Sequence, residues 1–248
     1  MFKKIVVIAP IITVASLSAD AQIVQGKNEI GLNIGTNVYQ GDLAPSALGS
    51  LKTIKPQLGI YYNRIISPYF SLRANLSAGS LKGNESLYSN KAYMQIRNFN
   101  FTASLKELSA LLVFSPYGDN GQIGFVKFSP YVFTGVAVSF LNINRDWSNL
   151  DISSVHNNSN ILTGLAIDTL HATPTVVPVI PLGLGVKYAL SQRIALTAET
   201  MYRYTFTDYL DGFKYAANPT KADSYYSFSI GLRYNFGKNK MKCPPVRR

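Results

Sequence analysis

The sequence predicts an all-β protein: an eight-stranded antiparallel transmembrane β-barrel with four long extracellular loops and short periplasmic turns. Eight stretches of the chain alternate apolar and polar residues with the period of two that is typical of a strand. The connections between them are alternately short and long, as in the barrels of an outer membrane. Because eight strands return the chain to the side on which it starts, both ends and the short turns are expected in the periplasm.

The clearest alternation is in the last strand, where Ile230 and Leu232 oppose Gly231 and Arg233. We expect strands over 30–38, 57–66, 70–79, 97–114, 128–140, 180–188, 194–206 and 226–236. Short turns then fall at 67–68, 115–126 and 190–193, and long outward loops at 40–56, 83–96, 143–178 and 207–223. Ser67-Pro68 leaves room for only a tight turn.

Two local features modify this pattern. In the fourth strand the apolar residues change from odd to even numbers at Lys106-Glu107, which predicts a β-bulge, because one inserted residue reverses the alternation. Pro174, Pro178 and Pro181 predict that the stretch 173–181 ends the longest loop and stays out of central strand pairing.

The alternation alone does not say whether the apolar face points out to lipid or in to a ligand, as in a soluble lipocalin-like barrel. The polar face is rich in Gly, Ser and Asn, which suits a narrow packed interior better than a surface in water. Aromatic residues gather near strand ends, as the interface girdles of a membrane barrel require. These are Tyr61, Tyr62, Tyr69, Phe70, Phe114, Phe128, Tyr131, Tyr202, Tyr204, Tyr225, Tyr226, Tyr234 and Phe236.

The first residues have the three parts of a secretory signal peptide: Lys3 and Lys4, an apolar run over 5–17, and Ala19-Asp20-Ala21 before Gln22. An uncleaved anchor is the alternative, but the run is shorter than the roughly 20 residues of a spanning helix. We therefore expect a signal peptide at 1–21, a barrel at 22–236 and a basic periplasmic tail at 237–248 in an outer-membrane protein. Five of the 24 lysines and arginines lie in that tail: Lys238, Lys240, Lys242, Arg247 and Arg248.

Composition supports a lipid-facing surface, since charged residues make up only 15% of the chain and aromatic residues 12%. The one cysteine, Cys243, excludes an intramolecular disulfide framework. The basic residues of the strands are scattered and form no basic helix or basic-aromatic patch, so no nucleic acid is expected as a partner.

Charged residues on the polar face of the strands are expected to meet inside the barrel, where an isolated charge costs several kcal/mol. They are Arg73, Glu107, Lys187, Glu199, Arg203 and Arg233. Glu107 and Glu199 are the only acids well inside the expected strands, and each should contact an Arg or Lys. We interpret the set as a structural network that fills the lumen; a proton or ion path is the alternative.

The only two histidines, His156 and His171, fall in the longest loop near Asp151, Ser154 and Asp168. A hydrolase or acyltransferase can use such residues, but their spacing matches no catalytic motif. Two histidines and one distant cysteine make no metal-ligand set, and no glycine-rich phosphate loop opens a helix. We therefore expect no enzyme activity, no cofactor, no metal and no small-molecule substrate.

Several stretches, taken in order, resemble the PorG-like outer-membrane barrels of Bacteroidota over nearly all of the mature chain. They are 37–43 (NVYQGDL), 71–73 (SLR), 79–85 (GSLKGNE), 97–101 (RNFNF), 106–108 (KEL), 208–211 (DYLD), 231–237 (GLRYNFG) and 243–244 (CP). The resemblance implies a part in the type IX secretion system, in which such a barrel associates with a periplasmic ring of a lipoprotein and its partner. It implies no catalytic residues, and the loop at 143–178 departs from the pattern.

Two functions follow as hypotheses. In the first, a non-enzymatic barrel anchors or couples the secretion ring to the outer membrane, embedded in outer-membrane lipids, with its periplasmic turns and the tail, Cys243 included, making the contacts. In the second, a stand-alone surface barrel binds an external ligand or acts as an adhesin through its loops.

Overall fold

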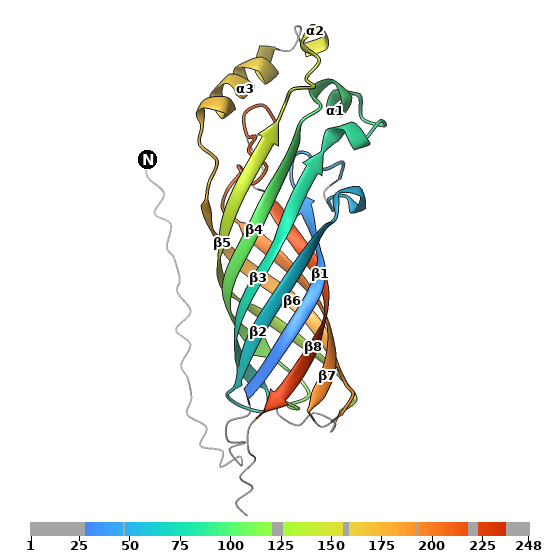
Figure 1. Ribbon diagram of the computed structural model, residues 1–248, viewed down its shortest axis with the longest axis vertical. Helices are drawn as coiled ribbons and strands as arrows, with labels where there is room; N and C mark the ends of the chain where they lie inside the picture. Colours follow the sequence, from blue (N-terminus) through green and yellow to red (C-terminus); the bar gives the residue numbers. More distant parts are fainter. Residues whose placement is uncertain are drawn as a thin grey trace, which may run out of the picture.

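The computed structural model describes residues 28–46, 48–120, 126–155, 159–191, 193–217 and 223–236. Within these residues eight strands form one closed barrel, in which each strand pairs antiparallel with its neighbours in sequence and β8 closes onto β1 (Figure 1). The strands are β1 (Asn28–Gln40), β2 (Lys55–Ile65), β3 (Phe70–Asn84), β4 (Asn100–Phe114), β5 (Phe128–Asp146), β6 (Val176–Ala189), β7 (Ile194–Thr205) and β8 (Ser224–Phe236). The predicted fold class is therefore confirmed.

The two ends of the barrel differ (Figure 1). At one end β2 meets β3 and β6 meets β7 in tight turns, and a longer connection over 115–127 joins β4 to β5. In the first turn, the amides of Ile66 and Ser67 both donate to the carbonyl of Phe70 at 3.0 Å. The other end carries the long loops and their short helices, η1 (Leu51–Thr53), η2 (Glu85–Leu87), α1 (Ala92–Arg97), α2 (Ile152–Val155) and α3 (Ser159–Leu170). No helix among the described residues is long and apolar enough to span a membrane. The expected signal peptide at 1–21 and tail at 237–248 lie outside the described residues.

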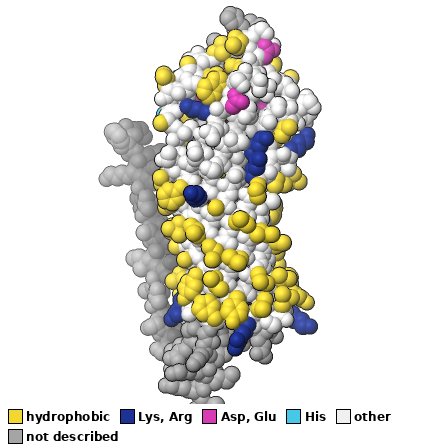
Figure 2. Space-filling view, viewed as in Figure 1, with side chains coloured by type: hydrophobic (Ala, Val, Ile, Leu, Met, Phe, Trp, Pro, Cys, Tyr) yellow, Lys and Arg dark blue, Asp and Glu magenta, His cyan; other side chains and the backbone are white. Residues whose placement is uncertain are grey.

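The apolar face of the strands points outward and the polar face inward, as predicted. Residues that should face lipid are between 46% and 66% exposed: Leu72, Val136, Leu184, Leu196, Ile230 and Leu232. Arg233, on the opposite face of β8, is 2% exposed. Figure 2 shows the outward apolar side chains as a belt around the lower part of the barrel. At the level of the apolar belt, a soluble barrel with an apolar interior is excluded, because there the charged residues are inside.

The strands on one side are longer than a membrane requires. A spanning strand needs about 9–11 residues, whereas β3 and β4 have 15 each and β5 has 19. Their upper parts rise beyond the apolar belt towards α1, α2 and α3 (Figures 1 and 2). The longest outward loop is accordingly shorter than predicted, because β5 continues to Asp146 and β6 begins at Val176.

The predicted bulge at Lys106-Glu107 is wrong. The register of β4 with both neighbours is continuous through these residues, which lie opposite Ala78 and Ser77 of β3. Side chains of β4 alternate strictly between buried and exposed along the whole strand. The change of phase instead marks the level at which the barrel leaves the membrane: above it the apolar residues turn inward and the polar ones outward.

Above this level the barrel is closed by an apolar core like that of a soluble protein. Phe101, Ala103 and Leu105 of β4 point inward and pack with buried residues of the other strands and the loops. Partners in this core include Tyr39, Leu43, Leu81, Phe99, Leu141, Val177, Val179, Leu210, Phe213 and Tyr225. The outward residues Thr102 and Ser104 are polar and exposed.

Three further sequence predictions need correction. Pro178 and Pro181 lie inside β6 and pair with β5 and β7, respectively. Arg97, expected to start the fourth strand, ends α1 and is buried among the loops. Tyr61, Tyr131 and Tyr225 do not belong to the aromatic girdle, because they point into the lumen and are 1%, 2% and 0% exposed.

Candidate functional site

The lumen contains a buried network of ion pairs between strands that are distant in sequence. Nη1 of Arg73 on β3 lies 2.7 Å from Oε1 of Glu199 on β7. The same carboxylate oxygen accepts a hydrogen bond from the Tyr131 hydroxyl at 2.6 Å. The Arg73 guanidinium lies over the Tyr61 ring, 4.3 Å from its centroid. These contacts fix the Arg73–Glu199 pair from both sides, because the aromatic faces attract the cation while the phenol binds the carboxylate.

A second pair lies closer to the loops. Nε of Arg203 on β7 donates to Oε2 of Glu107 on β4 at 2.8 Å. The hydroxyl of Tyr225 donates to the same oxygen at 2.8 Å, and Nη1 of Arg203 donates to Ser227 at 2.8 Å. Both strand glutamates therefore contact an arginine.

Two other lumen bases have partners that sequence reasoning missed. Arg233 pairs with Glu29 at 3.2 Å, and Lys187 pairs with Asp119 at 2.5 Å. Glu29 lies inside β1 because this strand begins two residues earlier than predicted, so Glu107 and Glu199 are not the only strand acids. Asp119 comes from the connection between β4 and β5, at the end of the barrel opposite the long loops. The alternation of apolar and polar residues in the strands gives no indication that the Asp119 side chain enters the lumen.

The network closes the lumen to solvent. Its eight side chains are at most 7% exposed: Glu29, Arg73, Glu107, Asp119, Lys187, Glu199, Arg203 and Arg233. The four bases are matched by four acids, which offsets the desolvation of each charge. The lumen at the level of these residues is therefore filled by paired side chains.

Above the network the loops are held by buried polar contacts. The Arg97 Nε donates to both carboxylate oxygens of Glu85 at 3.0 Å, and the Phe99 amide donates to Glu85 as well. Burial raises the pKa of Glu85, while the hydrogen bonds and charge of Arg97 oppose that shift. Arg97 also donates to the carbonyl oxygens of Asp42 and Ala216 at 3.3 Å. One ion pair thus connects the loops after β1, β3 and β7.

The loop between β7 and β8 is organised by two buried aspartates. The Tyr39 hydroxyl lies 2.7 Å from Oδ2 of Asp211 and 2.7 Å from Oδ1 of Asp223. The amide of Phe213 donates to Asp211 and that of Leu210 donates to Asp223. Burial raises the pKa of both carboxyl groups, and the charge of Asp211 adds to the shift of Asp223.

The residues considered for catalysis have structural contacts. Asp168 on α3 accepts hydrogen bonds from the amides of residues 214–216 and from the Tyr209 hydroxyl. His171 stacks on the Tyr209 ring at 4.3 Å. Asp151 accepts from the backbone amides and hydroxyls of Ser153 and Ser154, which lowers its pKa to about 2.

Asp168, His171 and Asp151 do not form a catalytic arrangement in the part of the chain that the structure describes. His156 lies outside that part. Within the described residues no group of three or more His, Cys, Asp or Glu side chains is placed to hold a metal ion.

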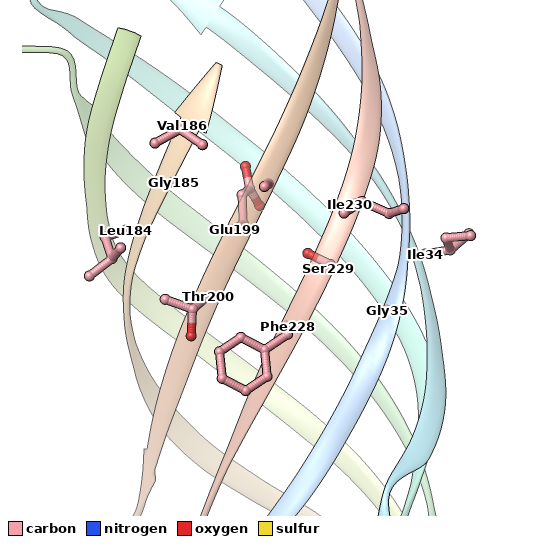
Figure 3. A pocket seen from close by; sticks show the side chains of 11 residues that line it. Ile34, Gly35, Leu184, Gly185, Val186, Glu199, Thr200, Phe228, Ser229 and Ile230 are labelled. Atoms are coloured by element: carbon pink, nitrogen blue, oxygen red, sulfur yellow. The ribbon is translucent and has the colours of Figure 1, made fainter. Parts of the chain in front are cut away.

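Two of the hollows on the described part of the surface bear on ligand binding. One, of about 590 Å³, is a cleft between the loops, lined by residues of all four: Gly41, Asp42, Ala44, Pro45, Ser46, Lys91, Tyr93, Arg97, Asn160, Ile161, Tyr215, Ala216 and Ala217. The other, of about 390 Å³, lies in the lipid-facing wall of β6, β7, β8 and β1 (Figure 3). Around it, outward side chains such as Ile34, Leu184 and Ile230 flank Ala198. The second hollow faces hydrocarbon, so of the two only the cleft is accessible to a polar ligand.

A closed barrel with an apolar outer belt and a charge-paired interior defines a transmembrane β-barrel of the outer-membrane type. The sequence of residues 3–245 matches the family described as a domain of unknown function (DUF6089), and the chain belongs to that family. A comparison with curated proteins finds no match in sequence.

Solved structures of eight-stranded outer-membrane barrels are similar in fold. Ail, the attachment invasion locus protein of Yersinia pestis, is 8% identical with a TM-score of 0.45, over 85% of this chain and 99% of that one. A major outer membrane protein of Thermus thermophilus is 13% identical with a TM-score of 0.45, over 84% and 99%. The outer membrane enzyme PagL is 10% identical with a TM-score of 0.39, over 83% and 98%.

Proposed function

We propose that this chain is a non-conducting and non-enzymatic outer-membrane barrel that anchors a periplasmic complex to the membrane. The observation that carries the proposal is the closed lumen: eight charged side chains inside the barrel form four ion pairs and are buried. A barrel that passes nothing through its interior acts through its ends. Planar-bilayer recordings of the purified protein should therefore show no steady ion conductance, whereas open channels would contradict the proposal.

The complex that we propose is the ring of the type IX secretion system, made of a lipoprotein and its partner. This assignment is supported by the ordered sequence stretches that resemble PorG-like barrels, such as 79–85 and 231–237. The contacts would come from the periplasmic turns and from the tail after Phe236. Five positive charges and no acid in that tail suit an acidic surface on the ring.

The experiment uses the full chain in its own outer membrane. A cross-linker attached at Cys243 should give a discrete adduct with a periplasmic ring protein, recovered by pull-down from solubilised membranes and identified by mass spectrometry. A strain whose only copy ends after Phe236 should lose type IX secretion while the barrel stays folded. Normal secretion by that truncated chain, or the absence of a ring protein from the pull-down, would reject the coupling role.

The loop cleft favours a second function, the binding of an external ligand at the cell surface. Its walls carry two exposed tyrosines, Tyr93 and Tyr215, beside the basic residues Lys91 and Lys214. Replacing both tyrosines with Ala should abolish surface binding if this function holds, and should leave secretion unchanged if the anchoring function holds. The matched comparison is the truncation after Phe236, which leaves the cleft intact.

A further inference from the structure

Two lysines stand on the outer wall of the barrel just above its apolar belt. Lys82 of β3 and Lys106 of β4 share the outward face of their strands with Leu76 and Leu108, which are 54% and 56% exposed. The outward residues around the lysines are hydroxylated: Ser80, Thr102 and Ser104. We name these five residues the outer lysine face. The outer lysine face begins where the outward residues change from apolar to polar. Because the apolar residues mark the hydrocarbon layer, this face lies at the height of the lipid headgroups.

The register fixes how far apart the two lysines are. Lys82 lies opposite Thr102, and Lys106 lies opposite Ala78 on the neighbouring strand. The two positions are therefore offset by four residues, which corresponds to about 13 Å along the strands. Two cations at that separation match a headgroup with phosphates at both ends of a disaccharide better than they match a single phosphate.

No acid neutralises these two lysines within the described residues, because neither forms an ion pair there. Glu107 of β4 points into the lumen. Asp146 at the end of β5 lies on the outward wall, where it pairs with Asn100 of β4 two residues beyond Thr102 and forms no ion pair with either lysine. On the face drawn in Figure 2, basic side chains lie both above and below the apolar belt, and the acidic ones lie near the top. The outer lysine face is therefore a positive surface at the height of the outer leaflet headgroups.

The opposite side of the barrel is different. Towards the loop end of β7 the outward residues are Tyr204 and Phe206, which are 47% and 58% exposed. Their rings pack edge to face with centroids 5.1 Å apart. Aromatic residues sit at a membrane interface without selecting a charge. At this level the outward residues of β7 are therefore aromatic, whereas those of β3 and β4 include two lysines.

We propose that the outer lysine face binds a phosphorylated glycolipid of the outer leaflet. The two ammonium groups contact its phosphates, the hydroxyls of Ser80, Thr102 and Ser104 contact its sugars, and its acyl chains lie on the apolar wall around Leu76 and Leu108. The charge complementarity, the hydroxyls and the continuous apolar wall below identify the occupant as a lipid rather than free phosphate. This inference does not depend on the secretion role.

The test measures lipid binding to the purified full chain in detergent micelles by native mass spectrometry, with diphosphorylated lipid A as the probe. Each lysine near an anionic lipid contributes about five-fold in affinity. The double variant Lys82→Gln/Lys106→Gln should therefore bind about 25-fold more weakly. The matched control Lys127→Gln/Arg193→Gln removes two exposed charges at the periplasmic end and should bind within about two-fold of the native chain.

Further arms separate the possible sources of binding. Lys82→Arg/Lys106→Arg should restore binding, and lipid A with one phosphate removed should bind more weakly than the diphosphorylated form. All variants must show the heat-dependent gel mobility of a folded barrel, which is expected because the replaced side chains lie outside the core. Equal affinity of the double variant and the control would overturn the proposal. So would displacement of the lipid by inorganic phosphate at an equal phosphate concentration.

Discussion

Arg203 on β7 and Glu107 on β4 form an ion pair across the barrel at 2.8 Å, and neither side chain is accessible to solvent. The two residues are 96 positions apart in the sequence. Their pairing is the reason that a polar interior is compatible with a closed barrel, because each charge offsets the desolvation of the other.

We expect Glu107→Ala to lower the free energy of unfolding by about 3–5 kcal/mol, because Arg203 is left as a buried charge without its partner. Urea unfolding of the barrel in lipid vesicles, followed by gel mobility, measures the change. The double variant Glu107→Leu/Arg203→Met should recover most of the loss. A single variant as stable as the native chain would show that the pair is not essential to the lumen.

Ile230→Arg should destabilise the barrel by about 2–4 kcal/mol, because the new charge lies in the hydrocarbon near the middle of the membrane. Thr102→Arg is the matched control, since this outward residue lies above the apolar belt and should cost at most about 1 kcal/mol. Both values come from the same urea titration. Equal costs at the two positions would mean that the membrane does not end where the outward residues of β4 become polar.

The contact of Asp211, Asp223 and Tyr39 predicts a dependence on pH. The Tyr39 hydroxyl has one proton to donate, so its contact with the second carboxyl group requires a proton on that group. Because the pKa of both aspartates is raised in the folded protein, the folded state holds protons that the unfolded chain releases above the ordinary value of 3.8. The stability of this loop is therefore greatest below that value and falls as the pH rises through the raised pKa.

Hydrogen exchange at the amides of Leu210 and Phe213, corrected for intrinsic rates, reports this loss of stability. Protection should decrease from acidic to alkaline pH in the native chain. In Asp223→Asn one of the two charges is absent, so the decrease should be much smaller. A native chain with constant protection over this range contradicts the shared proton.

Asp168→Ala should loosen the loop between β7 and β8 without unfolding the barrel, since three backbone amides lose their acceptor. Lys214 lies in that segment, so limited trypsin digestion should cleave after it faster than in the native chain. Asp151→Ala is the control, because the hydrogen bonds of the Asp151 carboxylate go only to the neighbouring Ser153 and Ser154. Unchanged cleavage after Lys214 would show that α3 does not hold this loop.

Local alternation was sufficient to predict the number of strands, their outward face and the buried position of charges such as Arg233. A strand has a period of two whatever its partners are, so a residue's face can be counted along the sequence. The same rule did not distinguish a bulge from a change of environment at Lys106-Glu107. Both reverse the pattern of apolar residues, and only the continuous register with β3 and β5 separates them.

What the sequence by itself determined is therefore the class of the protein, a membrane barrel with a polar lumen. The tertiary structure decided which charges meet, that Glu29 and Asp119 complete the network, and that the upper strands enclose an apolar core. These outcomes depend on register and closure around the barrel, which bring together residues such as Arg73 and Glu199 from positions 126 apart. The period of a strand carries no information about contacts at such separations, because it repeats identically in every strand.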